Sequence, residues 1–391
     1  MHASVDPQSD GPVRAWAAEF VERTVVPAAA ELDRQLHPAD CFSWDVLDAA
    51  EEIGLLTLTA SGEMGGAGFD AAAAAVVIEE LARGDLGVAL LVAQNLQLID
   101  LLRVAATSAQ LERWVRLVCE ERRAVLSLAL AEVDNSVDCL LILDDAADPL
   151  RTTADRRDGG WVLNGRKDLV LGGSLARLFL VFAQTDPPGG LTSGVTCFIV
   201  ERETPGLDVG PPHDKMGCRF APSTEFVLRD CFVPDENVLG RLHGGFDLLA
   251  QLFPFSHAYA AAGLLGISRT ASDRALKWAE TRVQGGQPII LHEAVATHLG
   301  EIRGLVEQMR GYAARAAQVA GGALELEPPC AIPELTLAAL VWRVVYSSME
   351  IHGGWAYMKE LGFDKLVRDG VAGAAVPPRV RVENGSERVS Q

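Results

Sequence analysis

The feature that most constrains the fold of this chain is a hydrophobic period that changes twice along its length. From residue 13 to about 121, apolar residues recur at helical spacing. From about 124 to 240 the pattern is one of short β-rich runs between Pro- and Gly-rich segments. From 244 to about 370 the pattern is helical again. This α–β–α order, without an internal repeat, predicts an α+β protein.

The chain is long enough for two or three domains, because it has 391 residues and a domain usually has about 100–200. We predict a flexible N-terminus at 1–12, an N-terminal helical domain at 13–122, a middle β-domain at 123–241 and a C-terminal helical bundle at 242–391. Within the middle region, the Asn-Gly pair at 164–165 is typical of a hairpin turn.

Composition and charge exclude several classes of function. A net charge of −19 disfavours binding to nucleic acid and to anionic membranes. The most apolar stretches, at 86–102 and 258–267, are interrupted by polar residues or too short, so we expect no membrane span. The N-terminus lacks the pattern of a signal peptide, which predicts a cytoplasmic protein. Seven cysteines, widely spaced and without a C-x-x-C pair, argue against disulfides and zinc.

Several motifs together resemble those of the acyl-CoA dehydrogenase family, over nearly the whole chain. The segments that carry the resemblance are K-M-G-C-R at 215–219, S-T at 223–224, V-P-D-E-N-V-L-G at 233–240, R-V-Q-G-G-Q-P-I at 282–289, E-I-H-G-G-W-A-Y at 350–357 and R-D at 368–369. The resemblance implies an N-terminal all-α domain, a middle antiparallel β-domain and a C-terminal four-helix bundle.

The resemblance also implies an activity. Members of this family bind FAD between the middle and C-terminal domains, usually as tetramers in which a neighbouring subunit completes each flavin site. A carboxylate removes the α-proton of an acyl-CoA thioester while the β-carbon loses hydride to flavin N5. The protein supplies orientation and electrostatics, and the flavin accepts the hydride. An electron-transfer flavoprotein is the expected partner that takes up the electrons.

The expected cofactor-binding residues fall in three of these motifs. Leu130 and Ala131 belong to A-L-A-E-V at 129–133, which resembles the family's A-L-T-E-P, so a flavin-bonding Thr is replaced by Ala131. Arg282 suits a pyrophosphate. Gly353 and Gly354 permit close backbone approach, or alternatively end a helix.

Other positions depart from the family pattern where flavin contacts are expected. Val137 stands where the family has Ser, and Gly285 where it has Phe. The residues after Lys167 include neither the aromatic residue nor the Ser/Thr that usually lie near the flavin. Glu350 stands in place of Gln and brings a negative charge towards the cofactor's phosphates.

The catalytic base is the sharpest departure. Counting the family spacing from Asp369 ends at Pro377, which cannot accept a proton. In a second branch of the family the base lies in the region of Ser256 and His257, where no carboxylate is present. Glu383, in E-N-G-S at 383–386, is the candidate base, as a displaced counterpart of the family's E-G-T. His257 is a chemically possible alternative, and a solvated tail is the competing interpretation of Glu383.

Three functions are compatible with these observations. The chain is a flavoprotein that desaturates an acyl-CoA or carrier-bound thioester. Alternatively, it is a subunit without a base that pairs with a complete dehydrogenase in a hetero-oligomer. The third possibility is a family member that performs other flavin chemistry, such as hydroxylation, isomerisation or reduction.

Overall fold

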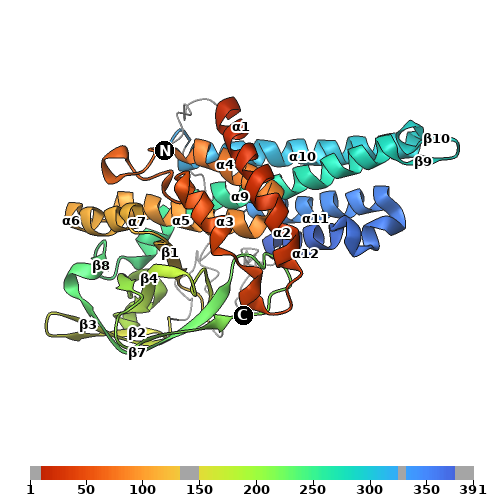
Figure 1. Cartoon of the computed structure of the whole chain (residues 1–391). Helices are drawn as coiled ribbons and strands as arrows, with labels where there is room; N and C mark the ends of the chain where they lie inside the picture. Colours follow the sequence, from red (N-terminus) through yellow and green to blue (C-terminus); the bar gives the residue numbers. More distant parts are fainter. Residues whose placement is uncertain (1–9, 133–148, 325–331, 375–391) are drawn as a thin grey trace, which may run out of the picture.

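The computed structural model describes residues 10–132, 149–324 and 332–374 of the chain. Helices form the N-terminal part, a sheet the middle and long helices the C-terminal part (Figure 1). The N-terminal helices are α1 (Asp10–Phe20), α2 (Val26–Asp33), α3 (Trp44–Glu52), α4 (Ala71–Gly84), α5 (Leu86–Ala105), α6 (Ser108–Gln110) and α7 (Arg116–Glu120).

Side-chain caps set the start of the two central N-terminal helices. The Asp70 carboxylate accepts a hydrogen bond from the Ala73 N–H at 2.8 Å and begins α4. Asp85 does the same for the Val88 N–H at 2.9 Å and begins α5. Each carboxylate satisfies an N–H that has no partner inside the helix. Because Asp85 also ends α4, the two helices join without a loop.

The described residues of the middle domain form one mixed sheet of eight strands. The strands are β1 (Val125–Ala129), β2 (Thr153–Arg157), β3 (Gly160–Leu171), β4 (Ala176–Gln184), β5 (Val195–Glu201), β6 (Leu207–Pro212), β7 (Ser223–Pro234) and β8 (Val238–Leu239), with the short α8 (Gly190–Ser193) between β4 and β5. Their order is β6-β7-β3-β2-β4-β5-β8, and β1 pairs with β4. Most pairs are antiparallel, as expected, but β4 pairs in parallel with β1 and β2.

The predicted hairpin turn at 164–165 is wrong. Asn164 and Gly165 lie inside β3, at a bulge where the pairing with β7 changes register. A Cβ on Gly165 would lie 2.6 Å from the Thr152 Cα, so this glycine is explained by a close approach of two backbones. The turn between β2 and β3 instead lies at Asp158–Gly159.

In the C-terminal domain, residues 245–324 and 332–374 contain four α-helices. They are α9 (Gly245–Thr281), α10 (Glu293–Ala320), α11 (Ile332–His352) and α12 (Phe363–Ala374), with the two-stranded β9 (Val283–Gln284) and β10 (Gln287–Pro288) between α9 and α10. Helix α9 also packs against α4 and α5 of the N-terminal domain. One helix therefore connects the two helical domains and the sheet.

Helices α5 and α9 are long and apolar enough to cross a membrane by length and composition. However, 72% of the most apolar window of α5 and 61% of that of α9 are buried inside the protein. Such burial is expected of core helices, and both helices contribute to the largest hydrophobic core.

Candidate functional site

The end of β1 carries the first two expected cofactor residues. Leu130 is buried, and Ala131 after it is exposed. The Ala131 carbonyl accepts a hydrogen bond from the Asp168 N–H at 2.9 Å. The Lys167 ammonium donates to the Leu130 carbonyl at 3.1 Å. Two bonds from β3 therefore fix this segment, although neither residue has a side chain that can hydrogen-bond to a flavin.

A bulge in β3 presents an apolar side chain next to this segment. Between Lys167 and Val170 the pairing with β7 changes register, and Leu169 has a left-handed backbone (φ 54°) and is 65% exposed. The carbonyl of Leu171 accepts a hydrogen bond from Gln94 Nε2 of α5 at 2.8 Å. Leu169 belongs to the segment after Lys167 that has neither the aromatic residue nor the Ser/Thr of the family motif, and it offers apolar contact without a polar group.

Ser256 and His257 lie on α9, in the region where a second branch of the family has its catalytic base. Ser256 donates a hydrogen bond to Gln97 Oε1 of α5 at 2.7 Å. His257 is buried against Phe253, and burial lowers the pKa of its imidazole to about 3. A neutral imidazole with so low a pKa is a weak base, which argues against His257 as the group that removes a proton.

The other three expected cofactor residues line one cleft of about 700 Å³ in the C-terminal domain. Arg282 follows the end of α9, and Gly353 and Gly354 follow the end of α11. A Cβ on Gly354 would meet nothing within 4 Å, so the cleft is open at this point. Gly353 has φ +59° directly after α11, which is the conformation of a helix-ending glycine. Both interpretations of the Gly-Gly pair are therefore compatible with its position.

Aromatic rings form one wall of the same cleft. Trp278 stacks on His352, with ring centroids 5.1 Å apart, and lies 6.5 Å from Trp355. The Arg282 guanidinium carbon is 5.9 Å from the Trp278 ring. Burial lowers the pKa of His352, so at neutral pH this ring is uncharged. The wall can take a planar ring, and Arg282 supplies a positive charge for an anionic group beside it.

Glu350 lines this cleft as well, as the sequence suggested. Its carboxylate is 3.5 Å from His298 Nε2, and its side chain is 49% exposed. A negative charge at the rim reduces the attraction of the cleft for phosphates, because it opposes Arg282. The aromatic wall and Arg282 suit the ring and the phosphate of a nucleotide. Because Glu350 also lines the cleft, the positive potential there is weaker than Arg282 alone would produce.

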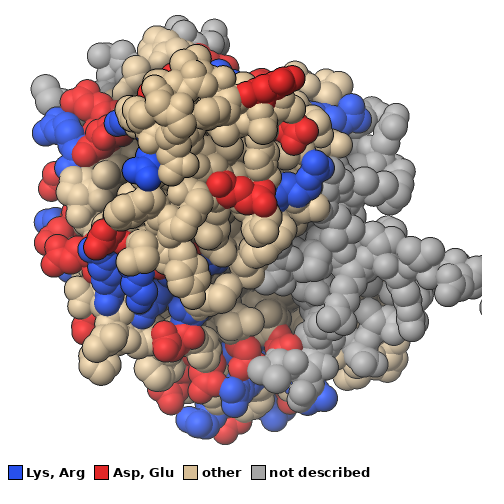
Figure 2. Space-filling model, turned by 90° about the vertical axis from the view of Figure 1, so that its right-hand side faces the viewer, with Lys and Arg blue, Asp and Glu red and all other residues tan. Residues whose placement is uncertain are grey.

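The two sets of expected residues lie in different parts of one chain. β1 is a strand of the sheet, whereas β9 and β10 lie at the far end of the C-terminal helices (Figure 1). Helix α9 alone has 37 residues, or about 55 Å at 1.5 Å per residue. Viewed from that far end, acidic and basic side chains alternate over the surface (Figure 2), so the net negative charge is not concentrated on this face.

Glu383, Pro377 and Val137 lie outside the residues that the structure describes. The candidate base and one of the expected flavin contacts therefore stay predictions.

Three models of the acyl-CoA dehydrogenase family match the chain. The N-terminal domain model covers residues 10–122, the middle domain model 143–231 and the C-terminal domain model 243–372. The order of these three domains agrees with the α–β–α architecture of the chain, and the three matches together cover most of its residues. The chain belongs to the acyl-CoA dehydrogenase family.

Individual relatives resemble it over almost their full length. The short-chain specific acyl-CoA dehydrogenase of Rattus norvegicus is 28% identical over 93% of this chain and 85% of its own. The cyclohex-1-ene-1-carbonyl-CoA dehydrogenase of Geobacter metallireducens is 30% identical, over 90% and 89%. Among solved structures, butyryl-CoA dehydrogenase from Megasphaera elsdenii has a TM-score of 0.86 at 25% identity and covers 95% of each chain.

Two features of the site were not predicted from the sequence. Trp278 belongs to no motif, and it enters the cleft only because α9 and α11 pack side by side. The partner of Lys167 is Glu132, at 2.8 Å, which is 35 residues earlier and follows the end of β1. Glu132 stands within the quoted A-L-A-E-V motif, but no pattern in the sequence connects it with Lys167, because Arg166 and Asp168 flank this lysine and make it look like one of several surface charges.

Proposed function

We propose that this protein is a flavin-dependent oxidoreductase that desaturates the Cα–Cβ bond of an acyl-CoA thioester. The observation that carries the proposal is the cleft in which Arg282, Gly353 and Gly354 meet, within a chain matched by all three family models. Arg282 pairs with a phosphate there, Gly354 leaves room for close approach, and Trp278 offers a face for an aromatic ring. FAD, when bound, accepts the hydride that the β-carbon loses.

The chain's own residues position the reacting groups at the β1 end. Ala131 is exposed and its carbonyl accepts a hydrogen bond from the Asp168 N–H, and the exposed Leu169 of β3 offers apolar contact. Glu383 is the proposed base that takes the α-proton. An electron-transfer flavoprotein is the proposed acceptor of the electrons.

Two chains are needed for one flavin site in this proposal. Within one chain, β1, which Ala131 follows, and β9, which begins directly after Arg282, lie far from each other (Figure 1). If both residues contact the same cofactor, Arg282 comes from a neighbouring chain. That chain is a second copy in a homo-oligomer or a related dehydrogenase subunit in a hetero-oligomer.

The test is to purify the protein, record its flavin spectrum and add butyryl-CoA and longer acyl-CoA thioesters without oxygen. Loss of the flavin absorbance near its visible maximum supports the desaturation proposal. Glu383→Gln should abolish this bleaching, whereas the matched tail variant Glu387→Gln should retain it. Bleaching that survives in Glu383→Gln overturns the role of Glu383, and a flavin-loaded protein that no thioester bleaches favours other flavin chemistry.

Glu350 favours a second candidate, a subunit that lacks a base and pairs with a complete family member. A rim carboxylate beside Arg282 weakens a phosphate site, and Ala131 has no hydroxyl for a flavin. A colourless protein that acquires FAD only when it is mixed with a related dehydrogenase supports this candidate. FAD binding by the protein alone, with thioester-dependent bleaching, overturns it.

A further inference from the structure

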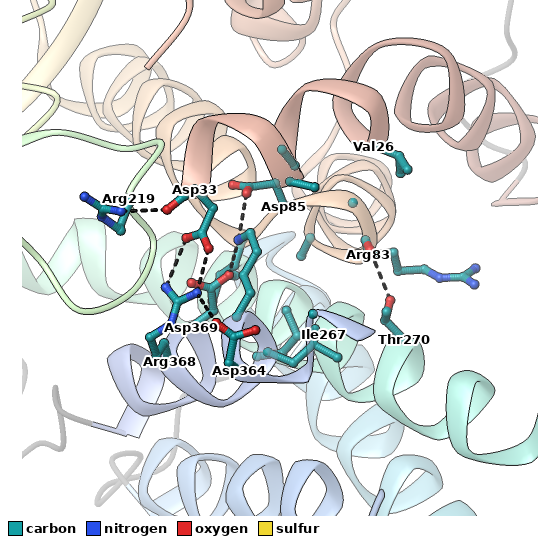
Figure 3. A pocket seen from close by; sticks show the side chains of 18 of the residues that line it. Val26, Asp33, Arg83, Asp85, Arg219, Ile267, Thr270, Asp364, Arg368 and Asp369 are labelled. Carbon is teal, nitrogen blue, oxygen red and sulfur yellow. Dashed lines mark hydrogen bonds and ion pairs between the residues drawn. The ribbon is translucent and has the colours of Figure 1, made fainter. Parts of the chain in front are cut away.

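A groove of about 1170 Å³, separate from the cleft, lies where α2, α4, α9 and α12 meet the 214–219 loop. Figure 3 shows that its wall carries a dense set of charges, with Arg368 bonded to both Asp33 and Asp364. Arg219 also donates to the Asp33 carbonyl at 2.6 Å. The groove is thus bordered by groups that connect three parts of the chain.

Nearly all of these charges neutralise one another within the protein. Five of the lining carboxylates have a cation within 3.2 Å: Asp33 and Asp364 with Arg368, Asp85 with Lys365, Asp273 with Arg83, and Glu80 with Arg83. Asp369 pairs with Lys365, and Asp214 lies 3.6 Å from Arg219. Paired groups of this kind have little attraction left for a further ion.

Arg274 of α9 is the exception. It lines the groove and is only partly exposed, and among the described residues it has no ion pair and no hydrogen bond. Its guanidinium carbon lies 4.5 Å from the ring centroid of the fully buried Phe363. Burial lowers the pKa of Arg274, and no carboxylate opposes this effect. A guanidinium has five N–H groups that can donate hydrogen bonds. The Phe363 ring holds the Arg274 guanidinium in place, and none of its N–H groups donates to a described residue.

Five other lining charges have no described ion pair. Arg34, Lys359, Glu22 and Glu360 are exposed and surrounded by solvent, whereas Lys215 is half-buried and donates a hydrogen bond to the Ala221 carbonyl. Arg274 is therefore the partly buried charge of the groove that has neither an ion pair nor a hydrogen bond among the described residues, so it dominates the local preference for a ligand.

We propose that Arg274 anchors an oxyanion-binding site in this groove, for a small molecule that carries a phosphate or carboxylate group. The Phe363 ring holds the guanidinium, whose N–H groups donate charge-assisted hydrogen bonds to the oxyanion. The volume of the groove leaves room for the remainder of such a molecule beyond its anionic group. The site is distinct from the cleft of Arg282 and does not depend on flavin binding.

The test is calorimetric titration of the full-length protein with inorganic phosphate and, separately, with succinate, in chloride buffer at constant ionic strength. We expect saturable binding of at least one probe, and the probe that binds more tightly distinguishes a phosphate site from a carboxylate site. Arg274→Gln should weaken that binding about tenfold or more, which corresponds to about 1.4 kcal/mol. Lys277→Gln, an exposed control three residues along α9, should change it less than twofold.

A second measurement separates binding from a merely structural role. If Arg274 only supports Phe363, Arg274→Gln lowers the melting temperature equally with and without phosphate. If Arg274 holds an oxyanion, the variant is as stable as the wild type in chloride and loses the stabilisation that phosphate or succinate adds. Arg274→Lys, which keeps the charge, should retain part of the affinity. Absence of saturable binding in the wild type, or equal binding by Arg274→Gln, overturns the proposal.

Discussion

Lys167 and Glu132 form an ion pair of 2.8 Å inside the β-domain, with side chains that are 0% and 4% exposed. The Glu132 carboxylate also accepts hydrogen bonds from the N–H groups of Arg151 and Thr152, at 2.7 and 3.0 Å. The nearby ammonium and these hydrogen bonds outweigh burial and lower the pKa of Glu132. The pair thus fixes the end of β1 against β3, directly beside Ala131.

Lys167→Met should destabilise the protein by about 3–5 kcal/mol, because it leaves a buried carboxylate without its cation. The double variant Lys167→Met/Glu132→Leu should recover part of this loss. Urea unfolding at pH 7 measures both. The control is Arg23→Met, which breaks an exposed pair with Glu19 and should cost less than about 1 kcal/mol. A cost for Lys167→Met no larger than that of the control contradicts a structural role for the buried pair.

His257 should make the protein less stable as the pH falls below its ordinary pKa. The folded state holds the imidazole neutral, with a pKa of about 3, whereas the unfolded chain binds a proton near pH 6.5. Between these values the unfolded state binds more protons, so the free energy of unfolding falls by up to about 1.4 kcal/mol for each pH unit of acidification. The stability contributed by neutral His257 is fully present above pH 6.5.

Urea unfolding of the wild type and His257→Gln between pH 4.5 and 7.5 tests this dependence. The variant should show a shallower decline with falling pH, while the exposed control His37→Gln should follow the wild type. Parallel curves for the wild type and His257→Gln would show that the imidazole is not held neutral.

The α–β–α order could be predicted from the sequence because hydrophobic period is a local property. The role of a single glycine, Gly165, could not be predicted in this way because it depends on a residue that is distant in the sequence. Gly165 follows Asn164, which is a strong hairpin signal, yet the need for a glycine here comes from the close approach of Thr152, the residue directly before the neighbouring strand β2.

The sequence predicted several residues of the candidate site but not how these residues are arranged in space. Family motifs identified Arg282 and the Gly353-Gly354 pair, and the structure brings them into one cleft. A family motif also identified Ala131. Motifs do not say how far apart residues lie in space, so the sequence could not predict that Ala131 and Arg282 belong to distant parts of one chain. Arg274 lies outside every motif, and its position over the Phe363 ring, without an ion pair to any described residue, depends on how α9 and α12 pack.

Glu350→Gln should strengthen FAD binding, because it removes the carboxylate that opposes Arg282 and restores the amide of the family motif. An interaction of about 1 kcal/mol at a half-exposed site corresponds to at most about a fivefold lower dissociation constant. Titration of the apoprotein followed by flavin fluorescence measures the change. Glu307→Gln, on the exposed surface of α10, is the matched control. Unchanged or weaker binding in Glu350→Gln contradicts an electrostatic effect of this residue on the cleft.

Gly354→Leu should reduce FAD content without reducing stability. The position has open space around it and no left-handed backbone, so the larger side chain costs the fold little. It would, however, fill the approach that the proposed cofactor uses. The ratio of flavin to protein absorbance, together with the melting temperature, tests this. Gly62→Leu, equally open and in the N-terminal domain, should change neither quantity. Full flavin content in Gly354→Leu would argue against this cleft as the cofactor site.

Gly217→Ala should lower stability by about 1–3 kcal/mol through overpacking. A Cβ there would lie 2.2 Å from the Arg368 carbonyl oxygen and 2.9 Å from the Asp369 nitrogen, both of them backbone atoms of α12 that cannot move aside as a flexible side chain does. The matched control is Gly300→Ala in α10, where a Cβ meets nothing within 4 Å and the helix gains about 1 kcal/mol. Opposite shifts of the melting temperature are therefore expected. Equal shifts would mean that the 214–219 loop is not held as closely against α12 as this contact requires.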